Sequence, residues 1–243
     1  MSKFLVISQV FPPDPAAVGQ YFDEAAKALR DQGAEVTVLT ANRGYDNPDE
    51  KFEAFENREG VAVHRLAASS FGKSSMSIRL FGQLSFILQC FVRGLFTPKL
   101  TDLLVSTSPP MCGFVAVLIG WLRPSIRVHY WLMDLNPDQA ISLKVFKKNH
   151  PLVLAMDWLN RRVLGRANSV IALDRFMQER FCSKSLTCNR DLVSVLPPWP
   201  MDQHLGSVPH GENLFRKEHE HLITKLERSQ AKACYHPETE VLT

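Results

Sequence analysis

The sequence alternates strand-like and helix-like segments from residue 4 to about residue 196, and this alternation constrains the fold more than any other feature. Short apolar runs are each followed by longer segments with helical periodicity. The predicted strands are 4–8, 35–40, 61–65, 102–107, 126–132, 169–173 and 192–196, and the predicted helices are 20–31, 76–96, 111–122, 151–165 and 175–182. Such alternation predicts an α/β fold, a doubly wound, Rossmann-like parallel sheet.

The composition changes after residue 196, which predicts the domain organisation. Residues 1–196 are expected to form one Rossmann-like domain. Residues 197–211 (PPWPMDQHLGSVPHG) have the Pro- and Gly-rich composition of a linker. The charged tail, 212–243, has only a thin apolar stripe and is expected to be partly helical or disordered, because it cannot bury a core of its own.

Charge and cysteine content exclude several classes of protein. The formal net charge is +3, and no stripe of Lys and Arg with interleaved aromatics predicts a nucleic-acid partner. The balance fits an anionic membrane surface or a phosphorylated substrate. The five cysteines form no C-x-x-C pair, so neither a disulfide framework nor a zinc site is predicted, and we expect a cytoplasmic protein. The N-terminus has no signal-peptide apolar core.

Residues 76–96 (MSIRLFGQLSFILQCFVRGLF) are long enough to span a membrane, but Arg and Gln residues interrupt them. Two interpretations remain open. One is a core helix with two arginines that extend to solvent. The other is an interfacial helix at the inner membrane surface, with Arg79, Phe86 and Arg93 as contacts.

Ligands of open parallel sheets bind at the carboxyl ends of the strands. Three segments of this sequence lie at such ends: 9–19, 106–113 and 133–139. The first has neither G-x-G-x-x-G nor a Walker-type glycine loop. It offers Gly19, which either allows a close approach to a ligand phosphate beside a helix N-terminus or only permits a tight turn.

Asp134 follows an apolar strand, so its carboxylate is expected to project from the sheet edge. It could accept a proton from a hydroxyl, bind sugar hydroxyls, or serve as a structural cap. Asp138 could cap the next short helix, and Ser108 adds a hydroxyl at a neighbouring strand end. His129 lies within a strand and is expected to pack in the core. The remaining histidines give no pattern of metal ligands, so no metal is predicted.

Several segments in order resemble the N-terminal domain of family 4 glycosyltransferases of the GT-B fold. They are VFPPDPAAVGQY, GAEVTVLTA, STSPP at 106–110, the run Asp134-Leu135-Asn136-Pro137-Asp138, RANSVIALDRFMQERF and VSVLPPWP. The resemblance covers residues 3–218 and includes GENLFRKEH, which is similar to the lead-in to the second domain of the family.

The resemblance implies an acceptor-side domain that moves a sugar from a nucleotide-sugar donor to a glycan or lipid-linked acceptor, as in polysaccharide biosynthesis. Val18, Gly19 and Gln20 would face the donor pyrophosphate, and Asp134 would lie close to the acceptor hydroxyl as the catalytic residue. The acceptor-side positions implied with it are Ser108, Asn136 and Asp138. No cofactor is implied beyond the nucleotide-sugar co-substrate.

The sequence departs from the family after residue 218, because no second, donor-binding domain follows. We therefore expect a truncated or frame-shifted gene product that is inactive alone. The alternative is a non-catalytic acceptor-binding subunit, completed in trans by a separate donor-binding chain. The absence of every standard phosphate-loop motif weakens a third possibility, an unrelated nucleotide-binding enzyme.

Overall fold

The structure is a computed structural model that describes residues 2–44, 47, 49–69, 76–185 and 189–199, with the side chains of residues 76, 77 and 79 left aside. The chain divides into two units, Met1–Pro198 and Trp199–Thr243. The first unit carries the fold. Most of the predicted linker and the whole predicted tail lie outside the described residues.

The first unit is built on an eight-stranded sheet in the order β3-β4-β2-β1-β5-β6-β7-β8. All neighbouring strands are parallel except β3 and β4. The strands are β1 (Lys3–Ile7), β2 (Glu35–Ala41), β3 (Phe55–Arg58), β4 (Val61–Leu66), β5 (Asp102–Ser106), β6 (Arg127–Trp131), β7 (Ser169–Ala172) and β8 (Val193–Val195). The predicted α/β, doubly wound parallel sheet is therefore confirmed.

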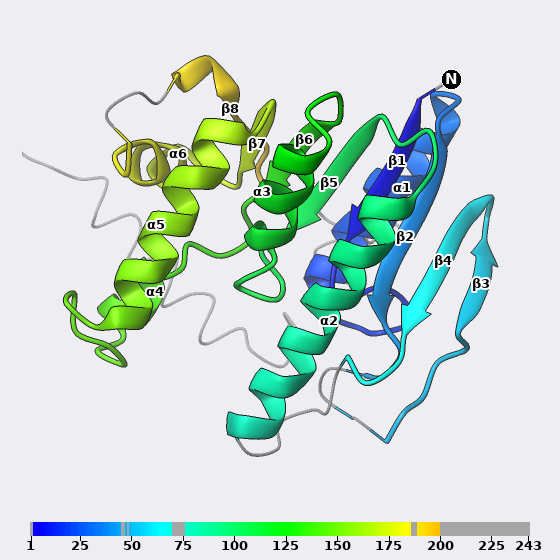
Figure 1. The fold of residues 1–243 in the computed structure, drawn as a ribbon, viewed down its shortest axis with the longest axis horizontal. Helices are drawn as coiled ribbons and strands as arrows, with labels where there is room; N and C mark the ends of the chain where they lie inside the picture. Colours follow the sequence, from blue (N-terminus) through cyan, green and yellow to red (C-terminus); the bar gives the residue numbers. More distant parts are fainter. Residues whose placement is uncertain (1, 45–46, 48, 70–75, 186–188, 200–243) are drawn as a thin grey trace, which may run out of the picture. The chain divides into compact units, whose positions relative to one another are not determined.

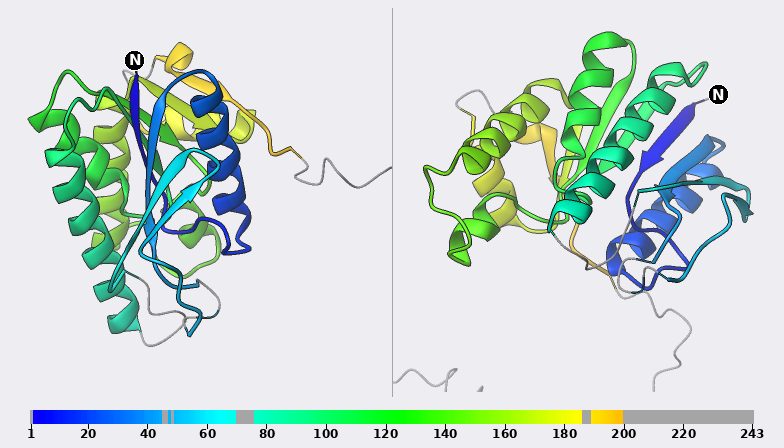
Figure 2. Two further views of the ribbon diagram at one scale, coloured as in Figure 1. Left: turned by 90° about the vertical axis from the view of Figure 1, so that its right-hand side faces the viewer. Right: turned by 60° about the horizontal axis from the view of Figure 1, so that its bottom comes forward.

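Helices cover the sheet in two layers (Figure 1). The helices are α1 (Ala17–Asp31), α2 (Met76–Phe96), α3 (Gly113–Leu122), α4 (Asp138–Ser142), α5 (Pro151–Arg166), α6 (Arg175–Cys182) and the 3-10 helix η1 (Arg190–Leu192). Viewed along the sheet, α2, α3 and α5 lie on one face and α1 on the opposite face (Figure 2). This double cover explains why β1 and β5 read as continuous apolar runs rather than alternating ones.

Helix α2 is held against the core by one side only. Gly82, Phe86, Cys90 and Gly94 recur every four residues and are buried, which places them on one helical stripe. Phe86 is fully buried. The sequence analysis placed Phe86 in the membrane-contact set, and this is corrected here, because a side chain in the core cannot reach a membrane surface. Among the described residues, no helix combines the length and hydropathy needed to cross a membrane.

Three further local predictions were wrong. No strand was predicted between residues 41 and 60, but this segment contains strand β3, which pairs antiparallel with β4 across a turn where Glu59 and Gly60 both have positive φ. Helix α1 begins at Ala17 rather than residue 20. Cys182 is disulfide-bonded, which the cysteine spacing did not predict, whereas Cys90 and Cys112 are free and buried.

Candidate functional site

The candidate site lies at the carboxyl edge of the sheet, where the connections on either side of β1 diverge. After β1 the chain passes to β2 on one side, and β5 lies on the other side. A crevice outside the strand ends at such a switch point is where open α/β sheets bind ligands. The loops after β1, β5 and β6 therefore meet at one place, as the sequence predicted from their positions.

The loop after β1 is fixed through Gln9 to the end of β2 and to two neighbouring loops. The Gln9 N–H donates to the Ser108 carbonyl at 3.0 Å, and the Gln9 carbonyl accepts from the Ala41 N–H and the Thr40 hydroxyl of β2, both at 3.1 Å. The Gln9 side-chain amide donates to the Ser69 carbonyl at 2.9 Å. Hydrogen bonds thus join the loop after β1 to the end of β2 and to the loops after β4 and β5.

Arg65 supports the same loop from beneath, and the sequence analysis did not single it out. Its buried guanidinium donates to the Pro12 carbonyl at 2.7 Å and forms an ion pair with Glu56, also at 2.7 Å. It lies over the Phe52 ring, 5.5 Å from the ring centre. The available signal was a cation at the end of an otherwise apolar strand, which needs a buried partner.

Gly19 is required by packing at this loop. A Cβ at Gly19 would lie 2.9 Å from the Phe11 Cα, 3.0 Å from the Phe11 nitrogen and 3.1 Å from the Val10 carbonyl carbon. All three are backbone atoms, which cannot move aside as a flexible side chain can. The Gly19 N–H donates to the Ala16 carbonyl at 2.9 Å, so the glycine itself offers no free donor to a ligand.

The donors that helix α1 does offer come one turn earlier than predicted. Its N-cap residue, Ala16, provides no side-chain cap. Within the described residues, the N–H groups of Ala17 and Val18 have no acceptor, as expected for the first turn of an uncapped helix. The Gln20 amide donates back to the Pro15 carbonyl at 3.1 Å. Among Val18, Gly19 and Gln20, only Val18 keeps a free backbone donor at this edge.

The loop after β5 positions Asp134, which follows the next strand, β6. The Thr107 hydroxyl accepts hydrogen bonds from the N–H groups of Met133 and Asp134, both at 3.1 Å. The Ser108 N–H donates to the Ser106 hydroxyl at 2.9 Å. The Ser108 carbonyl also accepts the hydrogen bond from the β1 loop. The loop after β5 therefore connects the predicted donor-side segment after β1 with the predicted acceptor-side segment after β6.

Asp134 has the properties of a group that can accept a proton. Its side chain is exposed at the edge, and within the described residues its carboxylate has neither a hydrogen bond nor an ion pair. Partial desolvation by the surrounding loops raises the pKa of Asp134 above its ordinary value. Among the described residues no cation or donor opposes that shift, so the carboxylate is more basic than an ordinary surface aspartate.

Asp138 is engaged elsewhere. Its carboxylate pairs with Arg180, with an Nη2 to Oδ1 distance of 2.6 Å, and with Lys184, which also binds Asp157 at 2.6 Å. Burial alone would raise the pKa of Asp138, but hydrogen bonds from Lys184 and Arg180 outweigh it and the pKa is lowered. Asp138 makes no side-chain cap on α4. It ties α4 to α5 and α6 rather than facing an open site.

Asn136 lies beside this network. Its carbonyl accepts a hydrogen bond from the Asn160 side-chain amide at 2.7 Å, which fixes the loop after β6 to α5. Within the described residues, the Asn136 side-chain amide has no hydrogen bond to another protein group, and its side chain is partly exposed. Together with Ser108, it lines the edge around Asp134 with polar groups.

His129 lies away from this edge, in a structural network near the start of β5. Its Nε2 is 2.9 Å from Asp102 Oδ1, and its Nδ1 is 2.7 Å from the Ser169 hydroxyl. The Asp102 carboxylate also binds Arg127 at 2.8 Å. Burial alone would raise the pKa of Asp102, but the hydrogen bonds from Arg127 and His129 outweigh it and the pKa is lowered. His129 thus belongs to a satisfied internal network.

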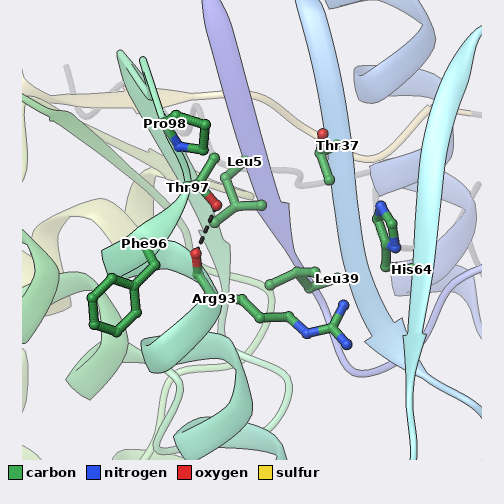
Figure 3. A pocket seen from close by; sticks show the side chains of 8 residues that line it. All are labelled: Leu5, Thr37, Leu39, His64, Arg93, Phe96, Thr97 and Pro98. Carbon is green, nitrogen blue, oxygen red and sulfur yellow. Dashed lines mark hydrogen bonds between the residues drawn. The ribbon is translucent and has the colours of Figure 1, made fainter.

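A cavity of about 350 Å³ lies on the α2 face of the sheet rather than at the candidate site (Figure 3). It is lined by Leu5, Thr37, Leu39, His64, Arg93, Phe96, Thr97 and Pro98. Burial, and then the charge of Arg93, lowers the pKa of His64. Arg93, predicted as a membrane contact, extends toward His64 over β2 (Figure 3). Arg79 falls among the side chains that the structure does not describe.

In the described part of the chain, no three His, Cys, Asp or Glu side chains lie close enough together to form a candidate metal site. The chemistry of the edge is that of one basic carboxylate, several neutral polar groups and the N-terminus of α1. Such a set can bind hydroxyls and an anionic group at the same time.

Comparison with known proteins identifies the family and the fold. The sequence matches the glycosyl transferase 4-like domain over residues 16–199. No curated protein matches the chain. Among solved structures, the catalytic domain of starch synthase IV from Arabidopsis thaliana, bound to ADP and acarbose, is similar, with a TM-score of 0.53 and 11% sequence identity. The alignment covers 93% of this chain and 59% of the length of that structure.

Proposed function

The chain belongs to the glycosyl transferase 4-like domain family, and from this premise we propose that it forms the acceptor-side half of a GT-B glycosyltransferase. The family identification made from sequence motifs is thereby confirmed, and a role in glycosyl transfer is proposed from it. The observation that supports the acceptor-side assignment is Asp134, a carboxylate of raised pKa without a partner in the described residues, at the switch point of the sheet.

In the proposed reaction, the acceptor hydroxyl lies against Asp134 while its oxygen forms a bond to the anomeric carbon of the donor sugar. The bond from that carbon to the phosphate oxygen breaks, and the nucleoside diphosphate leaves with the electron pair. Asp134 accepts the hydroxyl proton. Ser108 and Asn136 contact the acceptor, whereas Asp138 is assigned to the scaffold because its carboxylate is already paired.

The donor pyrophosphate is proposed to face the first turn of α1. The free N–H groups of Ala17 and Val18 and the positive end of the helix favour an anion there. Gly19 lets this turn lie directly on the β1 loop. We assign no metal or cofactor to the reaction. A donor-binding domain must supply the remaining contacts, because transfer requires both substrates in near-attack geometry. The chain alone is therefore proposed to be inactive.

A chimera tests this proposal. Residues 1–198 are joined to the donor-binding domain of a related GT-B enzyme and supplied with UDP-, GDP- and ADP-sugars and with oligosaccharide or polyprenyl-phosphate acceptors. We expect release of nucleoside diphosphate from the chimera and none from the 243-residue chain. Supplying the donor domain as a separate chain tests completion in trans. Turnover by the 243-residue chain alone would count against the proposal. So would a lack of turnover by every chimera with every donor.

Asp134→Asn in the chimera should lower transfer by roughly 10²–10⁴-fold, the range for loss of a general base. Asp191→Asn is the matched control, since Asp191 is also an exposed aspartate but lies in η1, beside β8. An Asp134→Asn chimera as active as the control would remove Asp134 from the reaction while leaving the family assignment intact.

A further inference from the structure

Helix α2 carries apolar side chains on its outer face as well as on its inner face. Ile78, Phe81, Leu84, Leu88, Val92 and Phe96 recur every three or four residues and are all exposed. Phe81 and Leu88 are each 62% exposed, and Phe96 is 75% exposed. A surface helix normally turns a polar face to solvent. The inner stripe of α2 packs on the core, whereas within the described residues Ile78, Leu84, Leu88 and Val92 of the outer stripe are 44–62% exposed.

Helix α3 extends this apolar surface. It contains no polar side chain (GFVAVLIGWL), and Leu118, Trp121 and Leu122 are exposed, Trp121 by 57%. The two helices pack without a gap, because a Cβ at Gly94 would lie 2.4 Å from the Ile119 Cδ1. We call the outer surface of these two helices, from residue 78 to 96 and from 118 to 122, the α2–α3 face.

Two arginines join the C-terminal ends of α2, α3 and α5 by hydrogen bonds. The Arg123 guanidinium donates to the carbonyls of Gly94, Leu95 and Thr97 at 2.8–3.3 Å, which joins the end of α3 to the end of α2. Arg166 joins the end of α5 to the Gly120 carbonyl at 2.8 Å. The face is therefore one fixed surface rather than two helices free to separate and bury their apolar residues.

Most exposed large apolar side chains in the described part of the chain belong to this one layer. The exceptions are Phe55, Phe176, Val195 and Leu196. Besides the α2–α3 face, the layer includes the connection from α4 to α5, where Leu143 and Val145 are exposed beside Lys144, Lys147 and Lys148. A concentration of exposed apolar side chains on one layer is typical of an interaction site.

The excess of positive charge in this part of the chain favours a negatively charged binding partner. Residues 76–166 hold eleven Lys and Arg but only four Asp and Glu, whereas the whole chain is nearly balanced, with 28 and 25. Neither α2 nor α3 contains an acidic residue. Three of the four acidic side chains, Asp102, Asp138 and Asp157, are already in ion pairs. The layer therefore presents apolar groups with uncompensated positive charge.

We propose that the α2–α3 face binds an anionic lipid surface. Apolar side chains enter the boundary between head groups and acyl chains, and the lysines of the α4–α5 connection contact anionic head groups. A second copy of the chain is a poorer occupant, since two basic surfaces would oppose each other. The inference concerns a different surface from the carboxyl edge and stands without the proposed transferase activity.

Vesicle flotation with the 243-residue chain tests the proposal. We expect binding to vesicles of phosphatidylcholine with 30% phosphatidylglycerol and much weaker binding to phosphatidylcholine alone. Salt at about 0.5 M should reduce the binding, because it screens exposed charges. Failure to bind the anionic vesicles, or equal binding to both compositions, would overturn the proposal.

Two double variants and one control test which residues form the membrane-binding surface. Leu84→Gln/Leu88→Gln should lower the partition constant at least tenfold, whereas Phe176→Gln, an equally exposed apolar side chain on α6, should bind as the unmodified chain does. Lys147→Gln/Lys148→Gln should weaken binding on the order of 30-fold, since each lysine near such a surface contributes about 1 kcal/mol. Unchanged partition of both double variants, with unchanged circular dichroism, would overturn the assignment.

Discussion

Replacing Gly19 with alanine is expected to destabilise the fold, although alanine is the better helix former. The added Cβ would approach three backbone atoms of Val10 and Phe11 at 2.9–3.1 Å, so the β1 loop or the first turn of α1 must shift. Overpacking of this kind costs about 1–3 kcal/mol. The gain in helix propensity is at most about 1 kcal/mol. We expect a net loss of roughly 1–2 kcal/mol in the free energy of unfolding.

The chain offers a matched control for this substitution in Gly165. It is also helical, near the end of α5, but a Cβ there meets nothing within 4 Å. Gly165→Ala should leave stability unchanged or raise it by up to about 1 kcal/mol. Urea denaturation followed by far-ultraviolet circular dichroism measures both variants. If Gly19→Ala is as stable as Gly165→Ala, the close packing of α1 on the β1 loop does not constrain this position.

The other predictions concern charge and the acceptor. The pKa of Asp134 should lie above 3.8 when the carboxyl carbon is followed by NMR. A pKa that is raised in the folded state means that the free energy of unfolding falls as pH rises through that pKa. Asp134→Asn should therefore be no less stable than the unmodified chain at pH 7. Asp138→Asn should cost about 1–3 kcal/mol at pH 7, because Lys184 loses one of its two carboxylate partners. Urea denaturation should show this difference shrinking as pH falls below about 4, since the pKa of Asp138 is lowered. In the chimera, Leu84→Gln/Leu88→Gln should slow transfer to a vesicle-bound acceptor but not to a short, water-soluble analogue.

The sheet could be predicted from sequence because its central strands are covered on both faces. Burial on both sides leaves short runs such as FLVI and LLV with no polar side chain, which is typical of central parallel strands. Strand β3 was not predicted from the sequence, because it lies at the edge of the sheet and lacks an apolar run. Except for Phe55 its side chains are polar, and Arg58 pairs with Asp23 of α1 at 3.1 Å. That partner is 35 residues away, and no local pattern predicts it.

The candidate site shows the same division between local and tertiary information. The position of Asp134 after a buried strand predicted where its carboxylate would lie. The pairing of Asp138 with Lys184 and Arg180 could not be predicted, because α6 approaches α4 only in the folded chain. Gly19 was predicted to face a donor phosphate, and that role stays a prediction. Its close packing on the Phe11 backbone and the hydrogen bond of its N–H to the Ala16 carbonyl could not be predicted from the sequence.

The two proposed surfaces are related through the direction of the chain. In a parallel sheet every covering helix starts at the carboxyl edge and runs back toward the amino edge, and α2 follows this rule (Figure 1). The first exposed residues of its apolar stripe, Ile78 and Phe81, are therefore at the end of the layer where Asp134 leaves the sheet. A domain that lies on a membrane through the α2–α3 face holds its carboxyl edge beside the bilayer rather than facing away from it. An acceptor anchored by a lipid could then present its hydroxyl to Asp134 without leaving the membrane, whereas a soluble acceptor would gain nothing from the apolar face.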